Sequence, residues 1–226
     1  MIPALRPDLE IIAQWIRPRS RVLDLGCGDG TLLRHLRETK QVESYGLEID
    51  DDNIVRCIEA GVNVIQMDID AGLSDFDADS FDYVVMSQTL QAVQHPDRML
   101  DEMLRVGREG IVTFPNFGHW LHRLQIAIGG RMPTSRVLPE PWYATPNIHL
   151  CTLSDFERLC RKKAITILQR QVVNSAHRTG PLMHRWPNLF AEIALYRFER
   201  SHRPEQATAP ETEGHPAGRP DQGTTS

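Results

Sequence analysis

The stretch "VLDLGCGDGTLLRHL", Val22 to Leu36, places three glycines within five residues, directly after an apolar run that contains one acid. Glycine adopts positive φ angles without steric cost and lets a ligand approach the main chain closely. The spacing of Leu32, Leu33 and Leu36 predicts a helix after the turn. A strand that runs through glycines into a helix brings a ligand to the carboxyl edge of a sheet. The stretch therefore predicts a ligand-binding turn; the alternative is a tight turn without a ligand.

The other residues of the turn decide which ligand it could hold. A phosphate-binding P-loop requires lysine, and "GDGTLL" contains none. A nicotinamide dinucleotide site uses G-x-G-x-x-G, but Thr31 occupies the third glycine position. Asp24 and Asp29 would also repel a pyrophosphate. The pattern that remains is acid-x-Gly-x-Gly-x-Gly, from Asp24 to Gly30.

Short apolar runs alternate with helical patterns in the first half of the chain. Apolar spacing predicts helices near residues 8–17, after residue 31, near 54–58 and near 99–104. Gly61 and Gly107 are expected to end the last two. Strands are expected at Arg21–Leu25, Tyr45–Ile49, Val62–Met67, Phe81–Met86 and Gly110–Phe114. This alternation is typical of βαβ units, which form a parallel sheet with helices on both faces.

The last third of the chain has a different pattern. The sequence "SDFE", Ser154–Glu157, is a capping box and predicts a helix start. Two closing strands are expected at Ile165–Val172 and Ala191–Phe198. The sequence between them is too short for a good crossover helix, which favours an antiparallel pair. We therefore predict an α/β fold with a mostly parallel seven-stranded sheet, an antiparallel last strand and helices on both faces.

Composition and charge exclude several classes of function. Hydrophobic residues make up 41% of the 226 residues and charged residues 24%, as in ordinary globular proteins. The net charge of -5 argues against a nucleic-acid partner, and no run approaches the roughly 20 apolar residues of a membrane span. The four cysteines lack CxxC spacing, so free thiols in a reducing compartment are expected. We expect a cytoplasmic protein with no nucleic-acid or membrane partner.

The chain divides into two regions by composition. Residues 201–226 contain four prolines and no Ile, Leu, Val, Met or aromatic residue. Such a segment cannot bury enough apolar surface to offset the entropy of ordering it. We predict a disordered tail at 201–226 and one ligand-binding domain at 1–200, with residues 115–150 as a cap or insert.

The glycine turn resembles a known type of cofactor site. "LDLGCGDG" is similar to the first motif of class I methyltransferases, which have a Rossmann-like fold and bind S-adenosylmethionine (SAM). "FDYVVMSQTLQAV" is similar to their fourth-strand motif. SAM carries a sulfonium and an ammonium but no phosphate, so the resemblance places Asp24 near its methionine end. The cofactor-binding residues implied are Asp24, Gly26, Cys27, Gly28, Gly30, Glu48, Ile49, Asp68, Ile69, Ser87 and Gln88.

Two of these acids have specific expected roles. Glu48 ends the second expected strand, about 20 residues after the glycine turn, where an acid can bind ribose hydroxyls. Asp68 ends the third expected strand, where methyltransferases commonly place an acid facing the adenine amino group, with Ile69 beside the ring. The alternatives are a surface acid for Glu48 and a loop-capping carboxylate for Asp68. Asp50 is expected to cap the next helix.

No catalytic motif is obligatory, because methyl transfer depends on alignment more than on acid–base chemistry. His95 is a candidate general base for an O-methyl acceptor; the alternative is a surface or capping role. His119 and His149 have no carboxylate or cysteine at ligand spacing, so we predict no metal site.

The connection at 115–150 is long and shows no clear secondary-structure pattern. It contains three arginines but a single acid, Glu140, and it holds Trp120, Trp142 and Tyr143. Long connections of this kind are usually functional. Arginines and aromatics are enriched at protein interfaces, and they would equally suit a lid over an anionic substrate.

Longer blocks carry a closer resemblance. "TFPNFGHWLHRLQ", "GGRMPTS" and "LPEPWYATPNIHLCTLSDFE", together with "RVLDLGCGDGTLL", resemble the MetW family of methionine-biosynthesis proteins over residues 7–199. The resemblance implies SAM as cofactor and a role with the homoserine O-acyltransferase MetX in homoserine acylation. The alternative is a SAM-dependent methyltransferase that acts on an unidentified small molecule.

Overall fold

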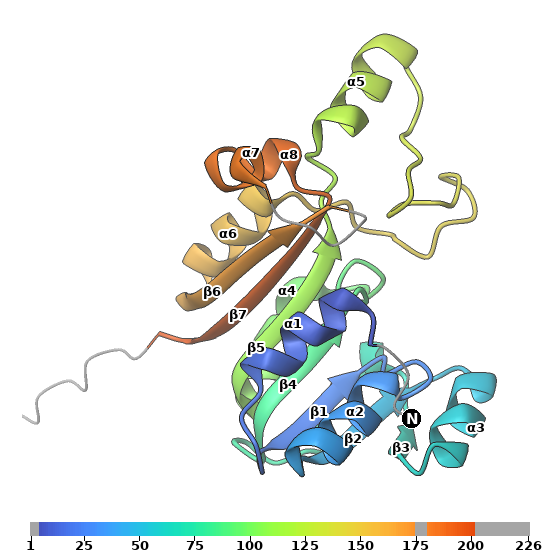
Figure 1. Cartoon of the computed structure of the whole chain (residues 1–226), viewed down its shortest axis with the longest axis vertical. Coiled ribbons are helices and arrows are strands. Elements are labelled where there is room, and N and C mark those ends of the chain that lie inside the picture. Colours follow the sequence, from blue (N-terminus) through green and yellow to red (C-terminus); the bar gives the residue numbers. More distant parts are fainter. Residues whose placement is uncertain (1–4, 175–179, 202–226) are drawn as a thin grey trace, which may run out of the picture.

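The computed structural model describes residues 5–174 and 180–201, which contain a seven-stranded sheet in the order β3-β2-β1-β4-β5-β7-β6 (Figure 1). The predicted mostly parallel sheet with helices on both faces is confirmed. Within the described ranges, no helix is long and apolar enough to span a membrane. The predicted tail lies outside the described residues, apart from Ser201.

The first five strands pair in parallel. They are β1 (Arg21–Leu25), β2 (Glu43–Glu48), β3 (Asn63–Gln66), β4 (Phe81–Ser87) and β5 (Gly107–Pro115). Helices connect all but one consecutive pair: α2 (Thr31–Lys40), α3 (Asp51–Glu59) and α4 (Pro96–Val106). The 3-10 helix η1 (Ile69–Ala71) follows β3. Parallel pairing requires such crossovers, so the observed order follows from the alternating pattern of the sequence.

The sheet closes with antiparallel strands, as predicted. β7 (Ile193–Arg200) lies between β5 and β6 (Ile165–Val173) and is antiparallel to both. The short helices α7 (Pro181–Arg185) and α8 (Pro187–Phe190) precede β7.

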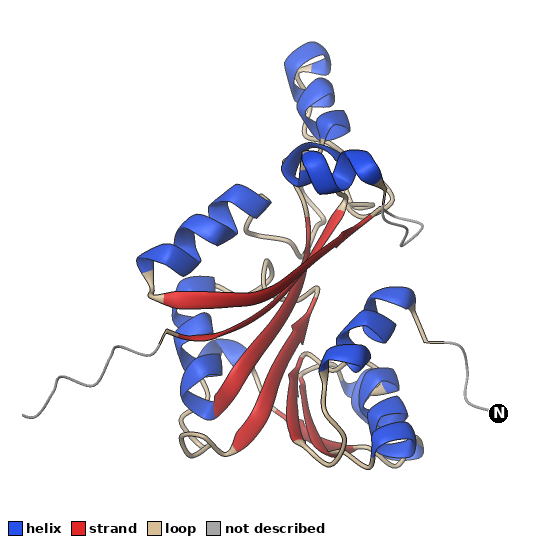
Figure 2. Cartoon of the chain, turned by 60° about the vertical axis from the view of Figure 1, so that its left-hand side comes forward, coloured by secondary structure: helices blue, strands red, loops and turns tan. Residues whose placement is uncertain are grey.

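Two apolar cores cover the two faces of the sheet, and Figure 2 shows helices on both sides. The core under α1 (Pro7–Trp15), α2 and α3 includes Tyr83 and Val85 of β4. The core under α4 and α6 (Leu153–Lys162) includes Val84 and Met86. This alternation along β4 is what a strand buried on both faces requires.

The predicted capping box was displaced by two residues. The cap of α6 is Thr152, whose Oγ1 accepts a hydrogen bond from the Asp155 backbone N–H at 3.2 Å. The helix therefore begins at Leu153 rather than after Ser154. Leu153 is 2% exposed, and this burial within the first turn favours the earlier start.

The connection after β5 also differs from expectation, because it contains the helix α5 (Trp120–Gly129). In its sequence, "WLHRLQIAIG", Trp120, Leu124 and Ile128 recur every four residues and form an apolar stripe, so the helical period was present. The stripe is exposed instead of packed on the sheet. In Figure 1, α5 projects from the end of the sheet, and most of its length stands clear of the other labelled elements.

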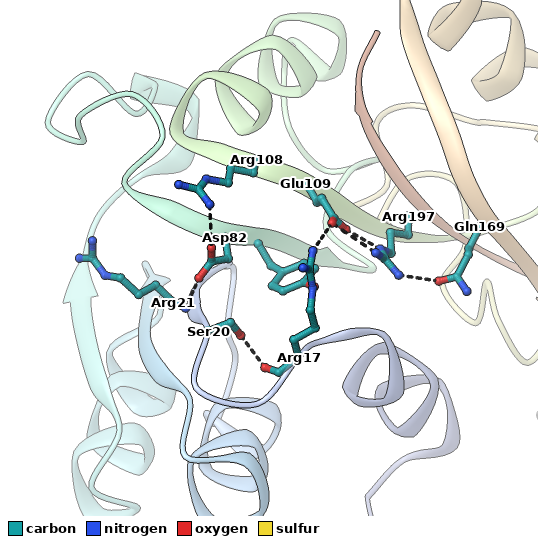
Figure 3. A network of polar contacts seen from close by, with 9 residues as sticks. Arg17, Ser20, Arg21, Asp82, Arg108, Glu109, Gln169 and Arg197 are labelled. Atoms are coloured by element: carbon teal, nitrogen blue, oxygen red, sulfur yellow. Dashed lines mark hydrogen bonds and ion pairs between the residues drawn. The ribbon is translucent and has the colours of Figure 1, made fainter. Parts of the chain in front are cut away.

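A polar network joins α1 to the sheet at the end opposite the glycine turn (Figure 3). Glu109 of β5 is 7% exposed and accepts a hydrogen bond from Arg17 Nη2 at 2.9 Å. It also accepts hydrogen bonds from Nε and Nη2 of Arg197 on β7. Arg17 donates through Nε to Tyr83 Oη at 2.8 Å. One carboxylate therefore ties the end of the first helix to two neighbouring strands.

We predict that Glu109→Gln lowers the free energy of unfolding by about 1–3 kcal/mol, because it leaves two arginines without their carboxylate. The matched control is Glu43→Gln, which breaks the exposed Arg21–Glu43 pair, 3.7 Å apart. An exposed pair contributes ~0–1 kcal/mol. Urea unfolding measures both variants, and equal losses would contradict the structural role of Glu109.

Candidate functional site

The candidate site lies where β1 and β4 end side by side. The chain leaves β1 toward β2 on one side and returns to β4 on the other, so the sheet changes direction here. Ligands of open α/β sheets bind outside the carboxyl ends of strands at such a point. The glycine turn occupies this place and is fixed to β2, because the N–H groups of Gly26 and Cys27 both donate to Leu47 O.

The turn needs glycine for two different reasons. Gly26 and Gly28 have φ of 73° and 56°. A Cβ on Gly26 would lie 2.9 Å from Thr89 Oγ1, whereas a Cβ on Gly28 would meet nothing within 4 Å. Gly30 also has positive φ, but its Cβ would lie 2.9 Å from Cys57 Sγ in the core. Gly28 therefore keeps space open, and Gly30 allows the turn to pack closely against α3.

The open space beside the turn is a cavity of about 200 Å³. Six of the predicted cofactor-binding residues line it: Asp24, Gly26, Cys27, Gly28, Ser87 and Gln88. The remaining lining residues come from the first helix region, the glycine turn and the start of α2: Arg6, Leu9, Asp29, Thr31 and Leu32. The structure thus brings the first motif and the end of the fourth strand together around one space.

Asp24 is the most unusual group in this cavity. It is 3% exposed, and its buried Oδ1 has no hydrogen-bond partner in the described part of the chain. Burial raises the pKa of Asp24 to about 7, and the negative charge of Glu48 contributes to the shift. A buried carboxylate of this kind is costly unless a donor or a cation reaches it. The cavity therefore provides a place where a cationic ligand group would be stabilised.

Glu48 holds the other side of the turn. Its Oε2 accepts a hydrogen bond from the Gly28 N–H at 2.8 Å, and its Oε1 accepts from the N–H groups of Ile49 and Asp50. Glu48 is 8% exposed, so it is not a simple surface acid. It orders the glycine turn and retains acceptor capacity, because an ionised carboxylate has about four acceptor positions. Asp50 caps α3 as predicted, accepting from the Asn53 N–H.

Gln88 links the cavity to the first helix. Its φ is 56°, an unusual value for a residue other than glycine, and its N–H donates to Thr113 Oγ1 at 3.0 Å. Its side-chain Nε2 donates to Asp8 Oδ2 at 3.2 Å. Asp8 is fully buried and also accepts from Arg6 Nε at 2.7 Å. These contacts fix the start of α1 over one wall of the cavity.

The predicted adenine-side residues lie outside the cavity lining. Asp68 is exposed at the end of β3 and caps η1, with Oδ1 accepting from the Asp70 N–H at 2.9 Å. Ile49 is 61% exposed, while Ile69 is half-buried and packs against the core. Asp68 therefore performs the capping role that was its alternative, and its carboxylate is exposed.

The histidines do not enter the cavity. His95 is exposed at the start of α4 and makes no capping hydrogen bond through its side chain. His119 and His122 are buried, and burial lowers the pKa of both imidazoles. The described residues contain no group of three or more potential metal ligands.

Sequence reasoning missed the contribution of the first helix to the site. Arg6 and Asp8 stand near the start of the chain, about 80 residues before Gln88. Their pairing depends on how α1 packs on the sheet, which no local pattern encodes. The sequence offered one indication of this contact, the acid Asp8 at the start of an amphipathic helix. An acid in the first turn of a helix is common, so Asp8 could not be recognised as part of a site.

Solved structures similar to this chain share its fold. A SAM-dependent methyltransferase from Mesorhizobium loti has a TM-score of 0.62 and 20% identity, with 86% of this chain and 96% of that chain covered. A chain in the complex of the Haloferax volcanii Trm112 methyltransferase activator and the putative methyltransferase has a TM-score of 0.61 and 15% identity (88% and 91% covered). The [4+2]-cyclase SpnF has a TM-score of 0.60 and 17% identity (85% and 80% covered). The fold is that of class I SAM-dependent methyltransferases.

Sequence comparisons go further than the fold. The bifunctional methionine biosynthesis protein MetXA/MetW of Rhodopirellula baltica is 35% identical over 210 residues, which cover 88% of this chain. The chain spans about a third of that protein, 33% of its length. The family model "Methionine biosynthesis protein MetW" matches residues 6–198. The chain belongs to the MetW family.

Proposed function

We propose that this chain binds SAM in the cavity beside the glycine turn and acts with the homoserine O-acyltransferase MetX to support homoserine acylation. The observation that carries the cofactor proposal is the buried carboxylate of Asp24 in the lining of a cavity bounded by open glycine backbone; its Oδ1 has no hydrogen-bond partner among the described residues. SAM has the matching chemistry, because its methionine end carries an ammonium and a sulfonium. The cavity lining contains no lysine, and its arginine, Arg6, is paired with Asp8.

Each part of the cofactor would meet a different group of residues. Asp24 would accept from the ammonium, and Arg6 at the rim would pair with the carboxylate. Glu48 would accept from the ribose hydroxyls with its remaining acceptor capacity. At the adenine end, Asp68 would accept from the amino group between Ile49 and Ile69. The Cys27, Ser87 and Gln88 side chains would border the cofactor.

The raised pKa of Asp24 predicts a pH-dependent affinity for SAM. An acid with a pKa of about 7 is mostly protonated at pH 6 and mostly ionised at pH 8, and only the ionised form attracts an ammonium. The affinity for SAM should therefore fall about tenfold between pH 8 and pH 6. Calorimetry measures this change, and an Asp24→Asn variant should bind weakly with little dependence on pH.

The same shift predicts the stability of the ligand-free protein. Because the folded-state pKa lies above the unfolded value, the folded state binds more protons, and stability falls as the pH rises from about 4 to 7. Above pH 7 the loss is complete. Asp24→Asn should therefore raise the melting temperature of the ligand-free protein at pH 8. An Asp24→Asn variant that is less stable than wild type at pH 8 would argue against an uncompensated carboxylate.

Gly28→Ala tests the open backbone of the turn. The change adds a methyl group to the cavity wall at φ of 56°, where L side chains are strained. We expect the affinity for SAM to fall at least tenfold, roughly 1.4 kcal/mol. Gly129→Ala is the control, since its Cβ also meets nothing within 4 Å and its φ is not positive. Equal affinities for SAM in the folded Gly28→Ala and Gly129→Ala variants would contradict SAM binding in this cavity.

The partnership with MetX is supported by the Rhodopirellula baltica relative, whose printed name joins MetXA and MetW in one protein. Fusion holds two domains at high local concentration, as a functional pair would require. SAM is formed downstream of homoserine acylation, so its binding here would report methionine supply to the acyltransferase. This feedback requires SAM to change the affinity between the two proteins.

An acylation assay tests the partnership directly. The rate of homoserine acylation by the cognate acyltransferase would be measured with and without this protein, at zero and saturating SAM. A clear rate increase on addition is expected, with a further dependence on SAM. If the rate is unchanged and the two proteins do not co-elute, the partnership fails. An increase that SAM does not alter would retain the partnership and end the feedback proposal.

A second candidate function is methyl transfer to a small acceptor. A second cavity, of about 180 Å³, supports it: Phe114, at the end of β5, and the exposed His149 both line it. It is mainly apolar, as small-molecule pockets are. Formation of S-adenosylhomocysteine from SAM, measured with homoserine, O-acylhomoserine and cell metabolite fractions, distinguishes this function. No turnover with any acceptor, together with activation of the acyltransferase, would exclude it.

A further inference from the structure

The helix α5 exposes a stripe of apolar side chains. Ile128 is 80% exposed, and Trp120, Leu124 and Ile126 are each more than 40% exposed. His122 is the one buried residue of the helix. Figures 1 and 2 show α5 standing out from the end of the sheet. The apolar stripe of a helix normally faces a core, so the exposed stripe of α5 requires a cover.

Hydrogen bonds hold the first turn of α5 in a fixed position, so its exposed residues have a defined place on the protein surface. Arg123 Nε donates to Gly118 O at 2.6 Å, and His122 Nε2 lies 3.0 Å from Ser135 Oγ. The helix therefore begins at a fixed place beyond β5. Its last turns, which include Ile126 and Ile128, point into solvent.

Next to this base lies a cavity of about 290 Å³ whose charged lining residues are three arginines and one acid: Arg123, Arg170, Arg185 and Glu157. Arg170 is paired with Glu157 at 2.9 Å. Arg123 and Arg185 have no carboxylate partner in the described ranges, and the Arg185 guanidinium lies over the exposed Trp186 ring. Arg123 belongs to α5 and also lines the cavity, so the apolar surface and the cationic cavity are continuous.

We propose that α5 and this arginine cavity together form the docking face for the homoserine acyltransferase, a surface that deepens and rests on the proposed function. Apolar side chains of α5 form its centre, and an acidic side chain of the acyltransferase enters the cavity between Arg123 and Arg185. This combination of aromatic, apolar and arginine groups is the composition of protein-interface hot spots.

The charge of the face favours this occupant over a second copy of the chain. A two-fold dimer through α5 would place the same surface of each copy against the other. Each copy would then have to supply acids for Arg123 and Arg185 of the other copy, and the acid of the cavity lining, Glu157, is already paired with Arg170. The segment at 115–150 contains a single acid, Glu140. The face therefore requires a partner with an acidic group and an apolar groove.

Binding of the purified acyltransferase to the full chain tests this proposal by calorimetry. Ile128→Asp and Arg185→Glu should each weaken the complex at least tenfold, with the affinity for SAM unchanged. The controls are Ile58→Asp and Arg56→Glu on α3, at the other end of the sheet, where Ile58 is 64% exposed. These two variants should bind the acyltransferase as wild type does.

The possible outcomes distinguish failure of the docking face from failure of the proposed partnership with the acyltransferase. If wild type binds the acyltransferase and the α5 and Arg185 variants bind equally well, the docking face is wrong and the partnership stands. Equal weakening by the α3 controls also overturns the assigned face. If wild type does not bind at all, both proposals fail. Light scattering on wild type and Ile128→Asp tests whether a second copy of this chain occupies the face instead. A wild-type dimer that dissociates in the variant would overturn the proposal in favour of self-association.

Discussion

The buried carboxylate of Asp24 determines which ligand charge the site favours. It lies at the end of β1, where the sheet changes direction, and its Oδ1 has no partner among the described residues. A folded protein retains an uncompensated buried acid at a cost to its stability. Such a cost is typical of binding sites, where the ligand supplies the missing partner. The surrounding turn, strand ends and first helix all position groups around this acid.

The glycine turn and Glu48 together shape the ligand-binding space. Open backbone at Gly28 leaves space for a ligand, and the Glu48 carboxylate keeps the Gly28 N–H in place. The same carboxylate raises the pKa of Asp24 through its negative charge. Two acids held close together, without a basic side chain between them, favour a cationic ligand over a phosphate. The fold itself does not decide the chemistry, because SpnF, named as a cyclase, has a similar fold.

The sequence predicts well what depends on local pattern and chain order. The strand–glycine–helix turn, the parallel strands and the antiparallel closing pair follow from apolar alternation and connection length. The Asp50 cap follows from local backbone chemistry. The Asp8–Gln88 contact joins residues 80 positions apart, and only packing of α1 brings them together. The apolar stripe of α5 follows helical spacing and could have been predicted, but it lies inside a long connection that was interpreted as irregular. That the stripe stays exposed depends on how the chain packs, which the local pattern does not encode.

The most direct test of the account is the affinity for SAM of this chain alone and of its complex with the acyltransferase, measured by calorimetry at pH 8. Binding to both forms with different dissociation constants is predicted, since a site that regulates a partner is coupled to it reciprocally. No detectable binding of SAM to either form would contradict the account, because the Asp24 carboxylate would then have no role as a ligand group.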